Sequence, residues 1–161
     1  MRRVGQFFGH LTARVDPGEA ALARNILPAG AWALFEAMPV ADRRHALDVV
    51  RRLLDAGHDD PQLLAAGLLH DAGKGRRLRL WQRVSGVLLQ AVRPSLLRRL
   101  ASADPRSRRY GFHLFLHHAE LSAAAATAAG CGELTAAFIT GRTGPSDALL
   151  ARALQLADEA S

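Results

Sequence analysis

A histidine and an aspartate stand side by side at His70 and Asp71, at the end of an apolar run, and Gly73 and Lys74 follow shortly after. Lys74 is the only lysine among the 21 Lys and Arg residues, so arginine supplies all the other basic side chains. An imidazole and a carboxylate are ligands for divalent cations, and a single ammonium beside them can neutralise phosphate oxygens. The stretch therefore predicts phosphate chemistry next to a bound cation.

A metal site needs further ligands from other parts of the chain, and two residues are suitable. His45 lies on a predicted helix over residues 40–56, which a short connection joins to the helix that ends in the doublet. Helices joined in this way tend to pack antiparallel, which would bring His45 and His70 to the same end of the pair. Asp158 lies in the last turn of the final predicted helix, where the helix dipole disfavours an acid unless a cation is near. Taken singly, each of these residues is also compatible with a purely structural role.

The elements that position these residues are predicted to be helices. Ala and Leu dominate the composition, β-branched residues are few, and no segment alternates as a strand does. The sequence therefore predicts an all-α fold in one domain. The expected helices cover approximately residues 16–25, a second from 28, 40–56, 60–71, 78–92, a short one from 94, 108–129, 133–140 and 145–158.

The net charge is +6 with histidines neutral, and it is unevenly distributed. Between Arg76 and Arg109 ten arginines face one acid, Asp104. Such a segment attracts phosphates, nucleic acid or an anionic membrane surface, unless it is only a solvated face. No run approaches the roughly 20 apolar residues that span a bilayer, so no transmembrane segment is expected. A single cysteine, Cys131, cannot form an internal disulfide, which favours a reducing, cytoplasmic location.

The ordered set of His45, His70, Asp71 and Asp158, with Gly73 and Lys74 directly after the doublet, resembles the HD-domain metal-dependent phosphohydrolase superfamily. The similarity spans about residues 40–160 and includes the residues around the first histidine, His45. The resemblance implies a single HD-domain helical bundle of about seven to nine helices, with residues 1–39 as an N-terminal helical extension. It also implies one divalent cation (Mn, Fe, Ni, Co or Mg), held by His45, His70, Asp71 and Asp158.

Some members of this superfamily bind a second cation through two further histidines. The segment that begins at His118 resembles the one that carries the first of these in bacterial symmetrical dinucleoside-tetraphosphate hydrolases. His118 is therefore a candidate second-metal ligand, catalytic group or phosphate contact. The expected place of the other histidine, residues 138–143, has none, and this departure favours one cation. Arg142 in that place is a candidate phosphate contact, or else a solvated turn residue.

Together these features lead to the hypothesis that the chain hydrolyses a phosphate ester or anhydride, on a nucleotide or another small phosphorylated molecule. The cation would activate water, Asp71 would ligate it, and Lys74 would neutralise charge that develops on the phosphoryl oxygens. One alternative is an HD-fold regulatory module that binds metal or nucleotide but hydrolyses little, which the missing histidine suggests. Another is nucleic-acid binding through residues 76–109, although no recognition motif is present.

Three other residues have less specific signals. Asp48, at the i+3 position from His45, is a candidate to orient its imidazole. His113 and His117 are spaced to share one helical face. No acid or cysteine in the sequence obviously completes a separate site with them.

Overall fold

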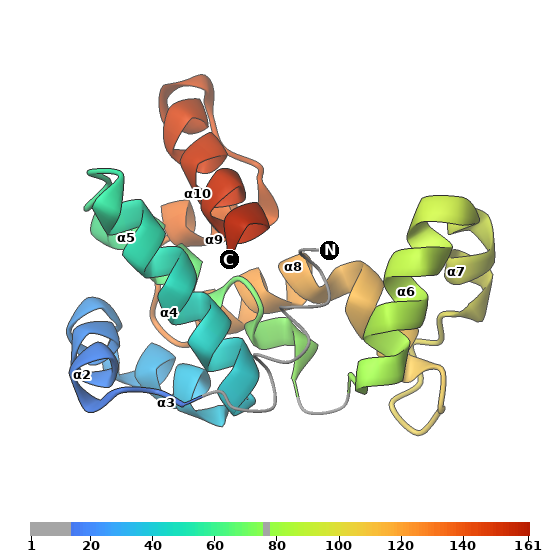
Figure 1. The fold of residues 1–161 in the computed structure, drawn as a ribbon. Helices are drawn as coiled ribbons and strands as arrows, with labels where there is room; N and C mark the ends of the chain where they lie inside the picture. Colours follow the sequence, from blue (N-terminus) through green and yellow to red (C-terminus); the bar gives the residue numbers. More distant parts are fainter. Residues whose placement is uncertain (1–13, 76–77) are drawn as a thin grey trace.

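The computed structural model describes residues 14–75 and 78–161, and within these ranges the protein is all-helical, as predicted. The part of the expected N-terminal extension before residue 14, and Arg76 and Arg77 of the basic segment, lie outside the described residues. No strand occurs in the described ranges, and no helix there is long and apolar enough to cross a membrane. The elements in Figure 1 are α2 (Pro17–Ile26), α3 (Ala29–Ala37), α4 (Val40–Asp55), α5 (Pro61–Leu69), the 3-10 helix η1 (Ala72–Lys74), α6 (Leu80–Val92), α7 (Pro94–Leu100), α8 (Tyr110–Ala128), α9 (Glu133–Thr140), the 3-10 helix η2 (Pro145–Asp147) and α10 (Ala148–Ala160).

Two helices begin at aspartates that cap them. The Asp16 carboxylate accepts a hydrogen bond from the Gly18 N–H of α2 at 2.8 Å. Asp60 accepts from the N–H groups of Gln62 and Leu63 of α5, both at 2.9 Å. A proline follows each aspartate, at the first helical position, where no intrahelical N–H bond is lost. These caps fix where α5, the helix before the His-Asp doublet, begins.

The hydrophobic core surrounds α5. Every residue of α5 from Leu63 to Leu69 is buried, against side chains of α2, α3, α4, α8, α9 and α10. Each large aliphatic side chain that is fully buried contributes about 1.5–3 kcal/mol of transfer free energy. The C-terminal end of α5, where the doublet lies, is therefore held on several sides by packing.

The turn after α5 differs from the prediction of a helix through residue 71. The α-helix ends at Leu69, and a 3-10 turn follows. Gly73 lies within that turn rather than at the end of a helix. A Cβ on Gly73 would lie 2.6 Å from the backbone oxygen of His118 and 2.7 Å from the backbone nitrogen of Ser122, both in α8. Glycine is therefore required because the turn and α8 approach closely.

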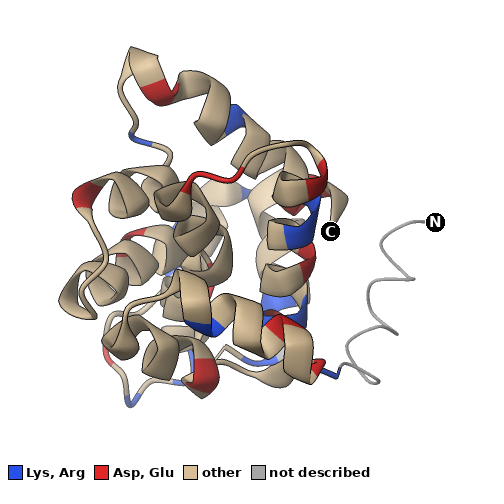
Figure 2. Ribbon diagram, turned by 90° about the vertical axis from the view of Figure 1, so that its left-hand side faces the viewer, with Lys and Arg blue, Asp and Glu red and all other residues tan. Residues whose placement is uncertain are grey.

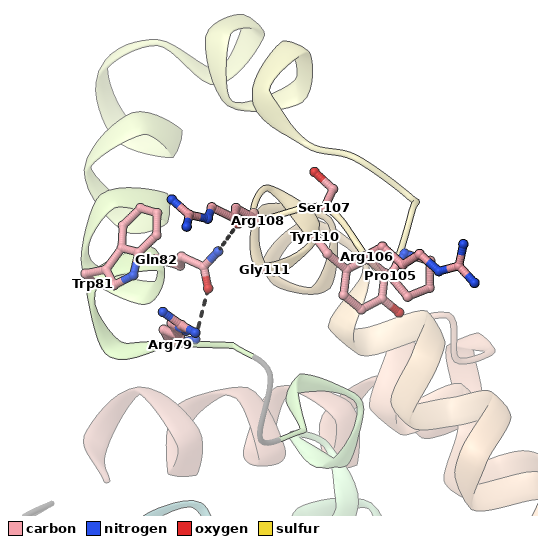
Figure 3. A pocket seen from close by; sticks show the side chains of 9 residues that line it. All are labelled: Arg79, Trp81, Gln82, Pro105, Arg106, Ser107, Arg108, Tyr110 and Gly111. Atoms are coloured by element: carbon pink, nitrogen blue, oxygen red, sulfur yellow. Dashed lines mark hydrogen bonds between the residues drawn. The ribbon is translucent and has the colours of Figure 1, made fainter.

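Helix α8 links this core to the pair α6 and α7. Its 19 residues extend about 28 Å, and in Figure 1 its N-terminal half carries α6 and α7 at one end of the molecule. Gln82 joins α6 to the segment before α8, because its amide accepts from the Arg79 N–H at 3.0 Å and donates to the Arg108 carbonyl at 2.8 Å (Figure 3). A Cβ on Gly111 would lie 2.1 Å from this amide oxygen, so a larger residue there would displace the Gln82 amide.

The side of the molecule opposite α6 and α7 has charges of both signs. Figure 2 shows acidic and basic residues interspersed over this side. Glu19 of α2 pairs with both Arg44 and Arg51 of α4. Arg44 also pairs with Asp48 at 2.9 Å. These arginine side chains are thus neutralised by neighbouring carboxylates.

Candidate metal centre

The His70 side chain is oriented by the helix that precedes it. His70 follows the last residue of α5, and its Nδ1 donates to the carbonyl oxygen of Gly67 at 2.9 Å. A carbonyl can only accept, so the proton lies on Nδ1 and the lone pair of the neutral ring lies on Nε2. A backbone bond of this kind is the usual way in which a protein fixes the tautomer of a metal-ligating histidine.

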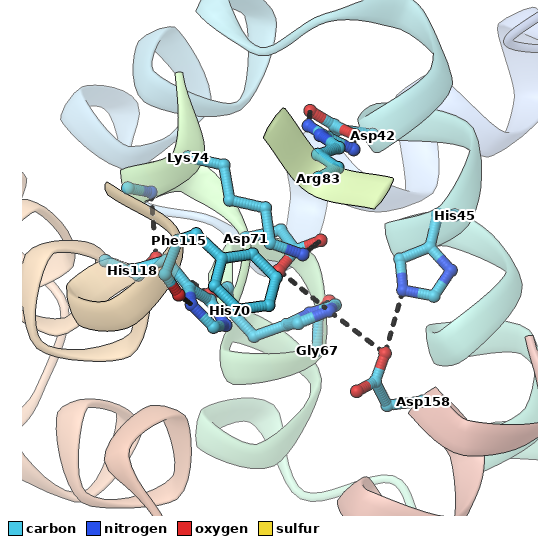
Figure 4. A network of polar contacts seen from close by, with 12 residues as sticks. Asp42, His45, Gly67, His70, Asp71, Lys74, Arg83, Phe115, His118 and Asp158 are labelled. Atoms are coloured by element: carbon cyan, nitrogen blue, oxygen red, sulfur yellow. Dashed lines mark hydrogen bonds and ion pairs between the residues drawn. The ribbon is translucent and has the colours of Figure 1, made fainter. Parts of the chain in front are cut away.

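Side chains from two other elements, α4 and α10, converge on this imidazole (Figure 4). His45 Nε2 of α4 lies 2.8 Å from Asp158 Oδ1 of α10, and His70 Nε2 lies 3.3 Å from the same oxygen. One ligand atom from each of the three residues lies within 4.8 Å of the others. Ligand atoms held about 2.0–2.3 Å from one cation would be spaced roughly 3–4 Å apart. The three side chains therefore form a group that could hold a divalent cation after a small outward adjustment of the 2.8 Å His45–Asp158 contact.

Asp71 lies at the edge of this group rather than within it. Its Oδ1 is 3.6 Å from His70 Nε2, and its Oδ2 accepts from the Lys74 ammonium at 2.6 Å. Of the four ligands that the sequence predicts, three thus form the compact group, and Asp71 adjoins it through His70. The Lys74 ammonium is directed to this carboxylate.

Two polar atoms at the centre of this arrangement lack hydrogen-bond partners. His70 Nε2 and Asp71 Oδ1 are both buried, and neither makes a hydrogen bond within the described residues. A buried polar atom without a partner costs about 1–3 kcal/mol, so native proteins rarely keep one. An electron-rich nitrogen and a carboxylate oxygen side by side are the donor types that a divalent cation would satisfy.

The charges of the group are strongly coupled. Burial opposes the charged form of His70, but the carboxylates of Asp71 and Asp158 outweigh it and raise the pKa of His70 to about 8. Burial also opposes ionisation of Asp71, yet His70 and Lys74 hold the pKa of that carboxyl well below its usual range. The pKa of Asp158 is likewise lowered: burial opposes its ionisation, but the adjacent imidazoles of His45 and His70 outweigh this. Both carboxylates are therefore anionic at neutral pH.

His118 of α8 lies near the group but outside it. Its Nδ1 donates to the Phe115 carbonyl at 2.9 Å, which leaves Nε2 as the atom available to a ligand. Burial and the nearby Lys74 ammonium lower the pKa of His118, so the ring is neutral at pH 7. It does not belong to the group of three in which the ligand atoms lie within 4.8 Å. Its role as a second-metal ligand or catalytic group stays a prediction.

The remaining candidates have other partners. Arg142, predicted as a phosphate contact, is 71% exposed and pairs with Glu120 at 3.1 Å, so this role also stays a prediction. Asp48 accepts from Arg44, and the carboxylate that contacts the His45 imidazole is that of Asp158. The rings of His113 and His117 lie 4.5 Å apart, centroid to centroid.

One ion pair near the candidate site was not predicted from the sequence. Arg83 of α6 donates to both oxygens of Asp42 of α4, at 2.8 and 2.7 Å (Figure 4). Asp42 is only 2% exposed, and the charges of Asp42 and Asp71 help to raise the pKa of Arg83 although burial opposes this. A buried aspartate in the first turn of an amphipathic helix is a weak signal, and its partner lies 41 residues away.

Ser122 was also missed, and it fixes the backbone of the doublet. Its hydroxyl donates to the His70 carbonyl at 2.7 Å and accepts from the Gly73 N–H at 2.8 Å. Ser122 is fully buried, so both bonds are shielded from water. One side chain of α8 therefore holds the turn on both sides of Asp71. A serine in an alanine-rich helix gives no local indication of this role.

No family model, no curated protein and no solved structure matches this chain. Any functional assignment therefore depends on the residues themselves, on their order in the sequence and on the geometry described above.

Proposed function

We propose that this protein is a metal-dependent phosphohydrolase of the HD-domain type, which acts on a phosphate ester or anhydride of a nucleotide or another small molecule. The observation that carries the proposal is the convergence of His45, His70 and Asp158 beside two buried atoms that make no hydrogen bond within the described residues, His70 Nε2 and Asp71 Oδ1. Mn, Fe, Ni, Co and Mg are all compatible with a set of imidazoles and carboxylates.

The protein would hold the cation mainly through His45, His70 and Asp158, with Asp71 Oδ1 completing the set. When bound, a divalent cation supplies Lewis-acid activation of water and of phosphoryl oxygens near neutral pH. The three anchoring side chains come from helices that the core holds in place, so little reorganisation would be needed on binding.

Lys74 would provide the positive charge that faces the substrate. Its ammonium is held by Asp71 Oδ2, beside the metal ligands, and its side chain is 21% exposed. From there it would neutralise charge on the phosphoryl oxygens as the transition state forms. His118 is neutral at pH 7 and presents Nε2, so it would accept a proton or a hydrogen bond from the substrate side.

The test begins with protein purified without added metal, followed by elemental analysis and a panel of nucleotides and generic phosphoesters with Mn²⁺, Ni²⁺, Co²⁺ or Mg²⁺. We expect about one cation per chain and turnover of at least one substrate. Asp71→Asn should abolish both while circular dichroism remains unchanged. Full hydrolysis by the Asp71→Asn protein would contradict the proposal.

A second pair of variants separates metal binding from catalysis. Lys74→Met should keep the metal but reduce kcat by about 100-fold or more, the usual effect of removing one electrostatic contact to the transition state. Arg152→Met removes an exposed cation of α10 whose partner is Gln155, and it should leave kcat unchanged. Equal kcat in the Lys74→Met and wild-type proteins would exclude the role assigned to Lys74.

The alternative function is a regulatory module that keeps the cation but hydrolyses little. It is favoured by Thr140, which lies where the superfamily resemblance calls for a histidine and whose hydroxyl donates back to the Ala136 carbonyl at 3.0 Å. Such a module would bind metal stoichiometrically and a nucleotide tightly, yet form no product with any member of the panel.

A further inference from the structure

Helix α6 packs on α8 with one face, and within the described residues a second, apolar face is left uncovered. Gln82 and Gly86 are buried toward α8, and a Cβ on Gly86 would lie 2.9 Å from the Phe115 ring. Among the described residues, five of the nine large hydrophobic side chains that are exposed belong to this one helix. They are Trp81 (53% exposed), Val84 (48%), Val87 (42%), Leu88 (61%) and Val92 (76%).

These five side chains form a continuous stripe, here called the α6 stripe. Positions 81, 84, 88 and 92 are spaced by three or four residues, so they lie above one another on one helical face. The stripe extends over roughly 17 Å of helix at 1.5 Å per residue. An exposed apolar surface of this kind marks a site of interaction.

The charged residues of α6 and α7 are all arginines. Residues 75–103 contain no Asp or Glu, and Arg83 is the only arginine of α6 or α7 that is paired with an acid within the described residues. Arg93 directly follows the stripe, Arg98 and Arg99 lie in α7, and all three are exposed with no acidic partner within the described residues. This contrasts with the opposite side of the molecule, where arginines have acidic neighbours (Figure 2).

A cavity of about 580 Å³ opens at the other end of the stripe (Figure 3). Its walls include the side chains of Arg79, Arg106 and Arg108, none of which has an acidic partner within the described residues, and the rings of Trp81 and Tyr110. Trp81 thus belongs both to the cavity and to the stripe. Cationic groups therefore adjoin the apolar surface at both of its ends.

We propose that α6, α7 and this cavity form a docking surface for an anionic phospholipid bilayer. The α6 stripe would enter the interface between headgroups and acyl chains, and the arginines at its two ends would contact lipid phosphates. An amphipathic helix with apolar and aromatic residues on one face and arginines around it is the form that binds membrane interfaces in this way. Arginines near an anionic surface strengthen such binding by electrostatic attraction.

Two other occupants fit the surface less well. A second copy of this chain would bring two arginine clusters together, and their repulsion opposes association. Nucleic acid would pair with the arginines through its phosphates but would leave the α6 stripe exposed to water. An anionic bilayer satisfies the stripe and the arginines together.

The experiment measures binding of the full chain to vesicles of phosphatidylcholine alone and of phosphatidylcholine with phosphatidylserine. We expect binding only to the second type, weakened by salt. Leu88→Asp should reduce the affinity at least tenfold, because it places a charge in the stripe. The matched control, Leu149→Asp, alters a residue of α10 that is 84% exposed, and it should bind as the wild type does. Both positions are exposed, and circular dichroism verifies that each variant folds.

Tryptophan fluorescence gives a second readout. The chain has two tryptophans, and Trp32 packs on Phe35 beside the core, so a blue shift on addition of anionic vesicles would report Trp81. A blue shift caused by the soluble headgroup glycerophosphoserine would overturn the proposal, as would equal binding to both vesicle types. Three further results would also overturn it. Leu88→Asp could leave vesicle binding unchanged, or the protein could bind nucleic acid more tightly than vesicles. Light scattering could also show a dimer that Leu88→Asp dissociates.

Discussion

His45 Nε2 and Asp158 Oδ1 lie 2.8 Å apart, although 113 residues separate them in the chain. Helix α10 packs against both α4 and α5, and this packing brings its last turn to the ends of the two histidine side chains. The carboxylate is 46% exposed, so the site opens to solvent on the side of α10. The final helix thus completes the candidate metal centre.

Replacing Asp158 tests this relationship directly. Asp158→Asn keeps the shape of the side chain but removes the negative charge, so we expect the affinity for a divalent cation to fall by at least about 100-fold. Isothermal titration with Mn²⁺ or Ni²⁺ measures the loss. The control is Glu159→Gln, because the Glu159 carboxylate contacts Gln155 along the same helix instead. Equal affinities in the two variants would mean that Asp158 is not a ligand.

The pKa of His70 predicts how the stability of the metal-free protein depends on pH. Because this pKa is raised from its ordinary 6.5 to about 8 in the folded state, protonation of His70 stabilises the fold below pH 6.5. That contribution is lost as pH rises from 6.5 through about 8. The pKa values of Asp71 and Asp158 are lowered, so their stabilisation is present above pH 3.8 and is lost as pH falls below it.

Urea denaturation at a series of pH values, with chelator present, measures this profile. The free energy of unfolding should decline between pH 6.5 and about 8, and His70→Asn should flatten the decline. His58→Asn, in the loop between α4 and α5, should keep the wild-type profile. Because a cation must displace the His70 proton, its apparent affinity should rise about tenfold per pH unit below pH 8. A pH-independent affinity would contradict this assignment.

Gly73→Ala tests the close approach to α8 of the 3-10 turn η1, which follows the His70-Asp71 doublet. The added methyl would meet backbone atoms of His118 and Ser122 at 2.6 and 2.7 Å, which cannot move as a flexible side chain does. We expect a loss of about 1–3 kcal/mol in the free energy of unfolding, together with weaker metal binding, because the turn positions His70 and Asp71. Gly144→Ala is the control, because its nearest neighbour is 3.8 Å away, and it should be neutral.

Arg83→Met tests the buried ion pair that joins α6 to α4. The substitution leaves the Asp42 carboxylate, 2% exposed, without its cation, and this should cost about 3–5 kcal/mol of unfolding free energy. The double variant Asp42→Asn with Arg83→Met should lose less, because no buried charge remains. Arg98→Met, on the exposed face of α7, should change the stability by less than about 0.5 kcal/mol. Chemical denaturation monitored by circular dichroism distinguishes these outcomes.

Local signals in the sequence were sufficient to predict the helices and to choose the candidate metal ligands. The Asp60 cap, the apolar spacing of α4 and the glycine and proline signals act within one or two turns, so the chain reveals them without knowledge of its fold. The resemblance carried by His45, the doublet and Asp158 likewise depends on order along the chain. Local signals do not fix the exact ends of every helix, because the end of α5 depends on the contact between Gly73 and α8.

Tertiary structure alone decided which side chains meet and which surfaces remain uncovered. The Asp42–Arg83 pair and the two bonds of Ser122 join residues 41 to 52 positions apart, and helical periodicity contains no information on such contacts. The tertiary structure also placed Asp71 outside the compact group of three candidate ligands, His45, His70 and Asp158. The pattern of α6 predicts an amphipathic helix, but only packing on α8 determines that Gln82 and Gly86 face inward and that the α6 stripe faces solvent. The physical reason is that side-chain chemistry and helix caps are properties of short segments, whereas convergence and exposure depend on how distant helices pack.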